Sequence, residues 1–391
     1  MPQQPRRSRR LAKLRTEEGL ADAQSSISNS GSPTESDETD DTLPSNPFAS
    51  QLGGRHSFPL PVHVPPHHSA NRAGSGDRTE HYSEESYDSD ADMEIVSNPN
   101  YRYTHLMFHK IDLRHAGSAV PEVIARHVQA IAQAGTEHMK LSPDHEADAI
   151  RILEKLGLGC TEMEVINCLS TYIFPSPDVV PSYGPATGLA ASSGSFMGRH
   201  LMPPQPPGAP YPLPQPRPDA LYGYPMTPKP FTDAQVQVLV NLHPEVLLYP
   251  STGSLYFPFL AAEFKAAAGT GGNLWVASNQ CAGVAAACLQ AVDQLNTVLK
   301  QHGCAGCIAN LCYSFAVDNN LAQLYVSWKE VDGTFCMQRV ESFLLSQPEH
   351  LSAFRCRVLC ILEWGRSGRL NELRSALDFI VHARQKQQGG Y

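Results

Sequence analysis

The sequence lacks any apolar run close to the roughly 20 residues that a helix needs to cross a bilayer. Its basic start, which contains "PRRSRRLAKLR" (residues 5–15), is not followed by a hydrophobic segment, so it does not have the pattern of a secretory signal. We therefore expect a soluble protein of the nucleus or cytoplasm with no membrane partner. The basic run is typical of sequences read by nuclear import receptors or nucleic acid, and a plain solvated tail is the alternative.

Cysteine is absent from residues 1–159, and all 10 cysteines lie between Cys160 and Cys360. Because that part of the chain is apolar, we expect reduced and mostly buried thiols, with no disulfide framework. Cys304 and Cys307 have the spacing of half a zinc site, but no second pair follows at that spacing, which argues against structural zinc. A Gly-x-Ser-x-Gly nucleophile motif, a His-Glu-x-x-His helix and the Gly-Lys-Ser/Thr ending of a phosphate loop are also absent.

Apolar residues are scarce in the first 98 residues, which hold 16 Asp and Glu against 9 Lys and Arg. This segment carries most of the net charge of −9, and such a composition buries too little surface to offset chain entropy. We predict that residues 1–100 are a disordered acidic tail. Its tracts "SPTESDETDD" and "YSEESYDSDADME" resemble phosphorylatable acidic sequences, and the tail is a candidate region for binding protein partners.

From about Tyr101 the sequence changes to helix and strand patterns. Apolar spacing and capping residues predict helices over 121–135, 142–157, 161–174, 231–248, 273–303 and 367–388. Strands are predicted over 253–266, 307–318 and 321–333. Residues 101–391 are therefore expected to form one α/β domain, with a mixed central sheet flanked by helices.

Residues 175–218 are rich in Pro, Gly, Ala and Ser and end in "PPQPPGAPYPLPQPRP". This composition predicts an extended, polyproline-like insertion that does not pack against the core. Such a segment is typical of a linker or a surface insertion. It is the second candidate region for binding protein partners.

The stretch "FPFLAAEFK" places Glu263 and Lys265 in an otherwise apolar strand. Residues two apart on a strand share a face, so these two side chains should project together while Phe264 points the other way. Charged side chains are rarely buried unless they are paired or hold a metal. The two residues are therefore either an ion pair at a strand edge, which is worth little in solvent, or part of a site.

Together with Pro218-Asp219, the sequence Glu263-Phe264-Lys265 resembles the Pro-Asp…(Asp/Glu)-x-Lys signature, PD-(D/E)xK, of the restriction-endonuclease-like superfamily. The surrounding residues 217–300 also resemble a family of fungal proteins of unassigned function with such a core. The resemblance implies a restriction-endonuclease-like fold in which two strands bring two acids and a lysine together.

By position, the resemblance implies that Asp219 and Glu263 bind Mg²⁺, with the carbonyl of Phe264 as a further ligand. It implies that Lys265 is the catalytic lysine and that Gln280 lies near the site. The implied function is Mg²⁺-dependent cleavage of phosphodiester bonds in DNA or RNA, in which the metal generates the nucleophile and offsets charge on the phosphate. The alternative is a catalytically inactive protein that keeps this fold and binds protein partners through its tail and proline-rich segment.

An acid from an earlier helix often completes clusters of this kind, and Glu146, Glu154 and Glu164 are the candidates here. Asp219 and Glu263 are 44 positions apart, so a helix-sized insertion must lie between the two strands. The sequence does not choose among the three acids.

Positive charge is concentrated at the carboxy-terminal end, where residues 351–391 hold 7 Lys and Arg against 3 Asp and Glu. Such side chains either contact nucleic-acid phosphates or form the solvated face of a helix. The arginines concerned are Arg355, Arg357, Arg366, Arg369 and Arg374.

Overall fold

The computed structural model describes residues 89–135, 139–175, 188–225, 230–242, 255–267, 273–304, 306 and 308–388. The predicted disordered tail lies outside these residues as far as position 88. Its last part is folded, because Ser89–Ser97 form helix α1, in which Val96 is buried and Met93 packs beside it. The folded part therefore begins before the boundary predicted at residue 100.

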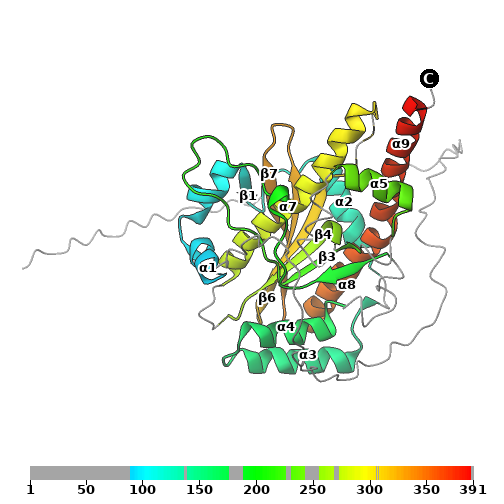
Figure 1. Cartoon of the computed structure of the whole chain (residues 1–391). Helices are drawn as coiled ribbons and strands as arrows, with labels where there is room; N and C mark the ends of the chain where they lie inside the picture. The colour runs from blue at the N-terminus through cyan, green and yellow to red at the C-terminus, as the bar shows by residue number, and fades with distance from the viewer. Residues whose placement is uncertain are drawn as a thin grey trace, which may run out of the picture. The chain divides into compact units, whose positions relative to one another are not determined.

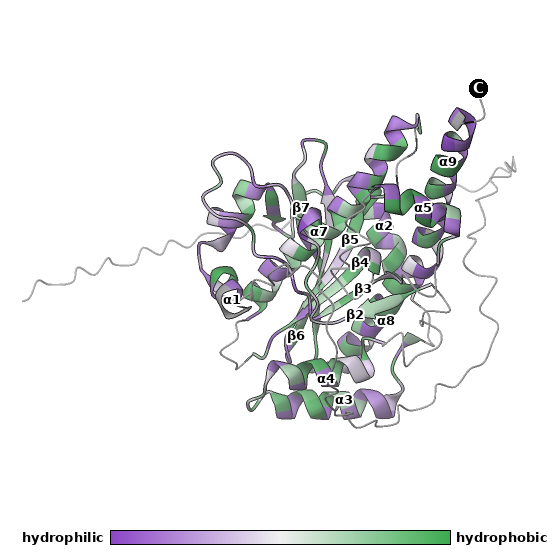
Figure 2. Cartoon of the chain, in the orientation of Figure 1, coloured by the Kyte–Doolittle hydropathy of each residue, from purple (hydrophilic) through white to green (hydrophobic). Residues whose placement is uncertain are grey.

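A mixed sheet of seven strands lies at the centre of the described chain, in the order β1-β7-β6-β5-β4-β3-β2 (Figure 1). The pairs β1–β7 and β4–β5 are parallel, and the other neighbours are antiparallel. The strands are β1 Ile111–Arg114, β2 Ala190–Ser192, β3 Ala220–Pro225, β4 Leu255–Phe264, β5 Leu311–Val317, β6 Leu321–Lys329 and β7 Phe335–Leu344. The central strands are largely apolar (Figure 2), and every residue of β5 is buried.

Helices cover both faces of this sheet, which confirms the predicted α/β class. On one face, α7 packs against β4 and β5 and α1 packs against α7; on the other, α2, α8 and α9 join the larger apolar core. The α-helices after α1 are α2 Glu122–Gln133, α3 Pro143–Leu156, α4 Glu162–Tyr172, α5 Asp233–Leu242, α7 Leu274–Gln301, α8 Pro348–Trp364 and α9 Leu370–Gln388. No helix among the described residues is long and apolar enough to span a membrane.

Local sequence explains where several helices begin. Ser142 caps α3 by accepting the backbone N–H of His145, and Asn273 caps α7 by accepting that of Trp275 at 2.9 Å. The predicted capping box at α4 is confirmed, since Thr161 accepts the N–H of residue 164 and the carboxylate of that residue returns to the Thr161 N–H. These caps fix the residues at which α4 and α7 begin.

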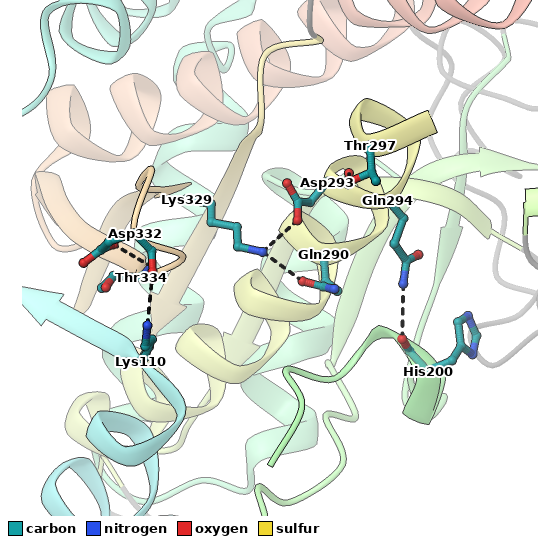
Figure 3. Close-up of polar contacts among 9 residues, drawn as sticks. All are labelled: Lys110, His200, Gln290, Asp293, Gln294, Thr297, Lys329, Asp332 and Thr334. Atoms are coloured by element: carbon teal, nitrogen blue, oxygen red, sulfur yellow. Dashed lines mark hydrogen bonds and ion pairs between the residues drawn. The ribbon is translucent and has the colours of Figure 1, made fainter. Parts of the chain in front are cut away.

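The described part of the proline-rich segment, residues 188–218, packs against the core, so the prediction of an unpacked insertion is wrong there. β2 pairs with β3, and Met197 is fully buried. Gln294 of α7 donates a hydrogen bond to the carbonyl of His200 at 3.4 Å (Figure 3). The segment packs because its scattered apolar side chains are buried against α7. Composition alone does not reveal such a contact with a distant helix.

Lys329 ties the end of β6 to α7. Its Nζ donates to Asp293 at 2.8 Å and to Gln290 at 3.3 Å (Figure 3). The Lys329 side chain is 18% exposed, and it does not line the cavity described below. This is a structural ion pair between a strand lysine and a helix acid.

The contact between the sheet and the end of α8 requires glycine at position 365. Gly365 begins a π-helical turn, η7 Gly365–Arg369, and its carbonyl accepts the hydroxyl of Tyr224 at 2.8 Å. A Cβ atom at this position would lie 2.0 Å from the Cζ atom of Phe259, far inside van der Waals contact. Only glycine lets the backbone approach this ring.

Candidate active site

β4 carries Glu263 and Lys265 into the middle of the sheet. The strand lies between β3 and β5, and these two residues are 1% and 2% exposed. Phe264 faces the other way, where its ring meets that of Phe174 with centroids 5.5 Å apart. The predicted alternation is confirmed, and the interpretation as an exposed ion pair at a strand edge is wrong.

The site residues indicated by the sequence line one cavity of about 400 Å³. Asp219, Glu263, Lys265 and Gln280 all contribute to its wall. The remaining wall comes from α1 and Tyr101, from α4, from three further residues of α7 and from residues 193–217 of the proline-rich segment. The fold thus brings together residues that are distant in the chain.

Asp219 and Glu263 form a buried carboxyl pair. Asp219 directly precedes β3, and its Oδ2 accepts the backbone N–H of Phe264 at 2.8 Å. The two carboxyl groups interact directly, and this interaction raises the pKa of Glu263 while it lowers that of Asp219, so a shared proton is favoured on Glu263. Burial, and then the negative charge of Asp219, raise the pKa of Glu263 well above its usual value, although Lys265 opposes this. Burial also raises the pKa of Asp219.

Lys265 is held by an acid that the sequence did not indicate. Its Nζ lies 3.0 Å from Oε2 of Glu162, the first residue of α4, whose side chain is 35% exposed. The backbone N–H of Lys265 donates to the carbonyl of Val317 at 2.8 Å, which extends the β4–β5 pairing by one residue. The ammonium group is therefore fixed at the cavity wall.

The structure places Glu162, and none of the three acids predicted from the earlier helices, beside Lys265. Glu146 accepts the hydroxyl of Ser352 at 2.7 Å, Glu154 is exposed, and Glu164 is used in its own capping box. The capping box could have indicated this result. It directs the side chain of Glu164 back to the N-cap residue Thr161, whereas Glu162, the first residue of α4, is not used in the box and can reach Lys265.

Two buried acceptor atoms that line the cavity have no hydrogen-bond partner in the described chain, Oε2 of Glu263 and Oε1 of Gln280. The Gln280 amide nitrogen contacts the sulfur of Met93 in α1 at 3.4 Å. An unsatisfied buried acceptor costs about 1–3 kcal/mol. A cation or a hydrogen-bond donor in the cavity would remove that cost.

These oxygen atoms suit a hard divalent cation such as Mg²⁺, which prefers one or two carboxylates and keeps several waters. Asp219 and Glu263 would supply the carboxylates and Gln280 an amide oxygen. The described residues contain no group of three or more His, Cys, Asp and Glu placed to share an ion. The nine described cysteines are free thiols.

Glu263→Gln is expected to stabilise the metal-free protein at high pH. Because the folded-state pKa of Glu263 is raised, the wild type loses stability as pH rises from the unfolded pKa of about 4.3 toward the folded one. Glutamine carries no charge and still donates to Asp219, so the variant should be about 1–3 kcal/mol more stable at pH 8 and no more stable near pH 4.

Urea unfolding in EDTA between pH 4 and pH 8 measures this difference. Glu363→Gln is the matched control, because Glu363 forms an ion pair with Arg366 and should gain no stability from losing its charge. A stability difference for Glu263→Gln that does not change with pH would contradict the buried carboxyl pair.

The carboxy-terminal arginines are engaged within the fold. Side-chain hydrogen bonds to other residues are made by Arg355, Arg357, Arg366 and Arg374. Arg357 and Arg366 each hold a carboxylate, those of Glu341 and Glu363. Arg369 is fully buried. Arg369 is therefore not part of a solvated helix face.

The fold and the site define an α/β protein with a buried carboxyl pair and a lysine at one cavity. Residues 151–377 match a family described as a domain of unknown function, DUF7924. Because the match covers more than half of the chain, the protein belongs to the DUF7924 family. The residues from Glu162 to Gln280 that form the site lie inside the match, whereas α1 and α2 lie outside it. Comparisons with curated proteins and with solved structures gave no match.

Proposed function

We propose that this protein is a metal-dependent phosphodiesterase that cleaves nucleic acid at a restriction-endonuclease-like site. The observation that carries the proposal is the meeting of Asp219, Glu263 and Lys265 at one cavity, although the two acids are 44 positions apart in the chain. The signature in the sequence and the geometry in the structure thus select the same residues.

The arrangement of elements around the site supports the same proposal. β2, β3 and β4 form an antiparallel meander, α7 follows, and β5 returns parallel to β4. The helix-sized insertion expected between the two strands is present as α5. The resemblance to the restriction-endonuclease-like superfamily and the resemblance to the fungal family both imply a strand pair that carries two acids and a lysine.

Asp219 and Glu263 would hold the metal, and Glu263 must lose its proton to do so. When bound, Mg²⁺ supplies a water of lowered pKa and offsets charge on the phosphate. Lys265, oriented by Glu162 at 3.0 Å, would align the attacking water or donate to a phosphate oxygen. Since the pKa of Glu263 is raised, metal affinity should increase with pH.

Calorimetry with Mg²⁺ or Mn²⁺ on the full chain tests the proposal. Wild type is expected to bind, more tightly at pH 8 than at pH 6, and Glu263→Gln should not bind, whereas Glu363→Gln should bind like wild type. Single- and double-stranded DNA and RNA are then tested as substrates. A wild-type chain that binds neither ion, even with nucleic acid present, would exclude the proposed function.

The alternative function, an inactive protein that binds protein partners, is favoured by one observation. The described residues hold two neighbouring carboxyls but no three-acid metal cluster. Residues 1–88 of the tail and residues 176–187 of the proline-rich segment, which would serve as partner regions, lie outside the described chain. The basic run at residues 5–15 lies there as well, so a nuclear or cytoplasmic location remains a prediction.

A further inference from the structure

Arg369 is a buried cation with few compensating contacts. Its exposed fraction is 0%, and an arginine side chain stays charged under all conditions in which a protein folds. Nη1 donates a long hydrogen bond to the carbonyl of Ala309 at 3.4 Å. The guanidinium carbon lies 5.2 Å from the ring centroid of Trp364 and 5.8 Å from that of Phe259. Burying a charge without a counter-ion costs several kcal/mol.

The remaining edge of this guanidinium, formed by Nε and Nη2, has no hydrogen-bond partner in the described chain. Two other arginines show what the same edge binds. Nε and Nη2 of Arg357 hold the two oxygens of Glu341 at 2.7 and 3.3 Å. Those of Arg366 hold the carboxylate of Glu363 at 2.7–2.9 Å. The corresponding edge of Arg369 is buried, and no carboxylate of the described residues forms an ion pair with it. The nearest acidic influence is the carboxyl of Glu372, whose pKa is raised by burial while the charge of Arg369 opposes that rise.

Two further polar groups near Trp364 are also buried without a partner among the described residues, the hydroxyl of Tyr313 and Nε2 of His127, and the charge of Arg369 acts on the His127 imidazole. Both rings contact Trp364, with centroid distances of 5.8 Å for Tyr313 and 4.7 Å for His127. The ring centroids of His127 and Tyr313 lie 6.0 Å from each other. β5, α2 and η7 thus each bring an unused hydrogen-bonding group to the surroundings of Trp364.

We propose that Arg369, Tyr313 and His127 form a binding site for a small oxyanion, namely a phosphate, sulfate or carboxylate group. The planar Nε and Nη2 edge matches two oxygens of one such group, and the hydroxyl and imidazole supply further donors. The site lies on the face of the sheet opposite the Glu263 cavity, because Tyr313 pairs with Leu260, which is out of phase with residue 263.

α2, which carries His127, is only loosely packed. Of its twelve residues only Ile131 is buried, and Val123 is 63% exposed. A small displacement of α2 would carry His127 outward and admit the anion. The inference does not depend on phosphodiesterase activity.

His127 reports on the site directly. Burial, and then the positive charge of Arg369, lower the pKa of His127 to about 4. An anion bound between the two groups would offset that repulsion and raise the pKa toward the usual 6.5. We therefore expect a saturable upward shift of the His127 pKa when the full chain is titrated with sodium phosphate, sulfate or acetate and followed by NMR of the imidazole ring.

Arg369→Lys keeps the charge but removes the planar edge, so it should weaken oxyanion binding by at least about tenfold. Tyr313→Phe removes only one hydroxyl and gives an independent test if the first variant fails to fold. Comparing phosphate with acetate distinguishes a phosphate group from a carboxylate. If no oxyanion moves the His127 signals, or if chloride at equal ionic strength moves them as much, Arg369 is a packing residue held by aromatic rings and the proposal is overturned.

Discussion

Lys265→Met is expected to reduce metal-dependent cleavage by at least about 1,000-fold while the fold stays intact. Lys265 lines the cavity, and its ammonium group lies 3.0 Å from the carboxylate of Glu162. Methionine has a similar volume but carries neither a charge nor a hydrogen-bond donor. The partner left behind, Glu162, has a side chain that is 35% exposed, so water can solvate it after the substitution. Activity should therefore fall much more than stability.

Lys329→Met is the matched control for this experiment. Lys329 also ends a strand and pairs with a helix acid, Asp293, at 2.8 Å, but it lies outside the cavity. Cleavage rates and thermal melting of both variants are measured in parallel. If Lys265→Met retains wild-type activity, or if both variants lose activity equally, Lys265 has no catalytic role.

Gly365→Ala is expected to destabilise the protein by about 3 kcal/mol or more, near the upper end of what overpacking costs. The added methyl group would lie 2.0 Å from one ring atom of Phe259 and 2.3 Å from another. Phe259 is fully buried in the interior strand β4, and the ring of Trp364 packs edge-on against the Phe259 ring with centroids 5.7 Å apart. The Phe259 ring therefore has no free space to move into.

Chemical denaturation measures this effect, with Gly117→Ala as the control. A Cβ atom at Gly117 would have nothing within 4 Å, so that variant should unfold within about 0.5 kcal/mol of wild type. Equal stability of Gly365→Ala and wild type would mean that the α8 end does not approach β4 as closely as described.

Elements with strong local signals were predictable from the sequence. The apolar period and the caps at Ser142 and Thr161 marked α3 and α4, and the turn sequence after Val317 marked the β5–β6 hairpin. Elements without such signals were not predicted. β7 and α8 follow one another with no clear capping side chain, and the short strands β1 and β2 become strands only by pairing with β7 and β3.

The amino-acid sequence by itself determined the α/β class, the alternation that sends Glu263 and Lys265 to one face, and the pairing of these residues with Asp219 as a candidate site. These properties depend on local periodicity and on a short signature. Only the tertiary structure decided that Glu162 holds Lys265, that the proline-rich segment and α1 wall the cavity, and that Arg369 is buried. Those outcomes arise from contacts between distant segments, because the burial of a side chain depends on the neighbours that the whole fold brings to it.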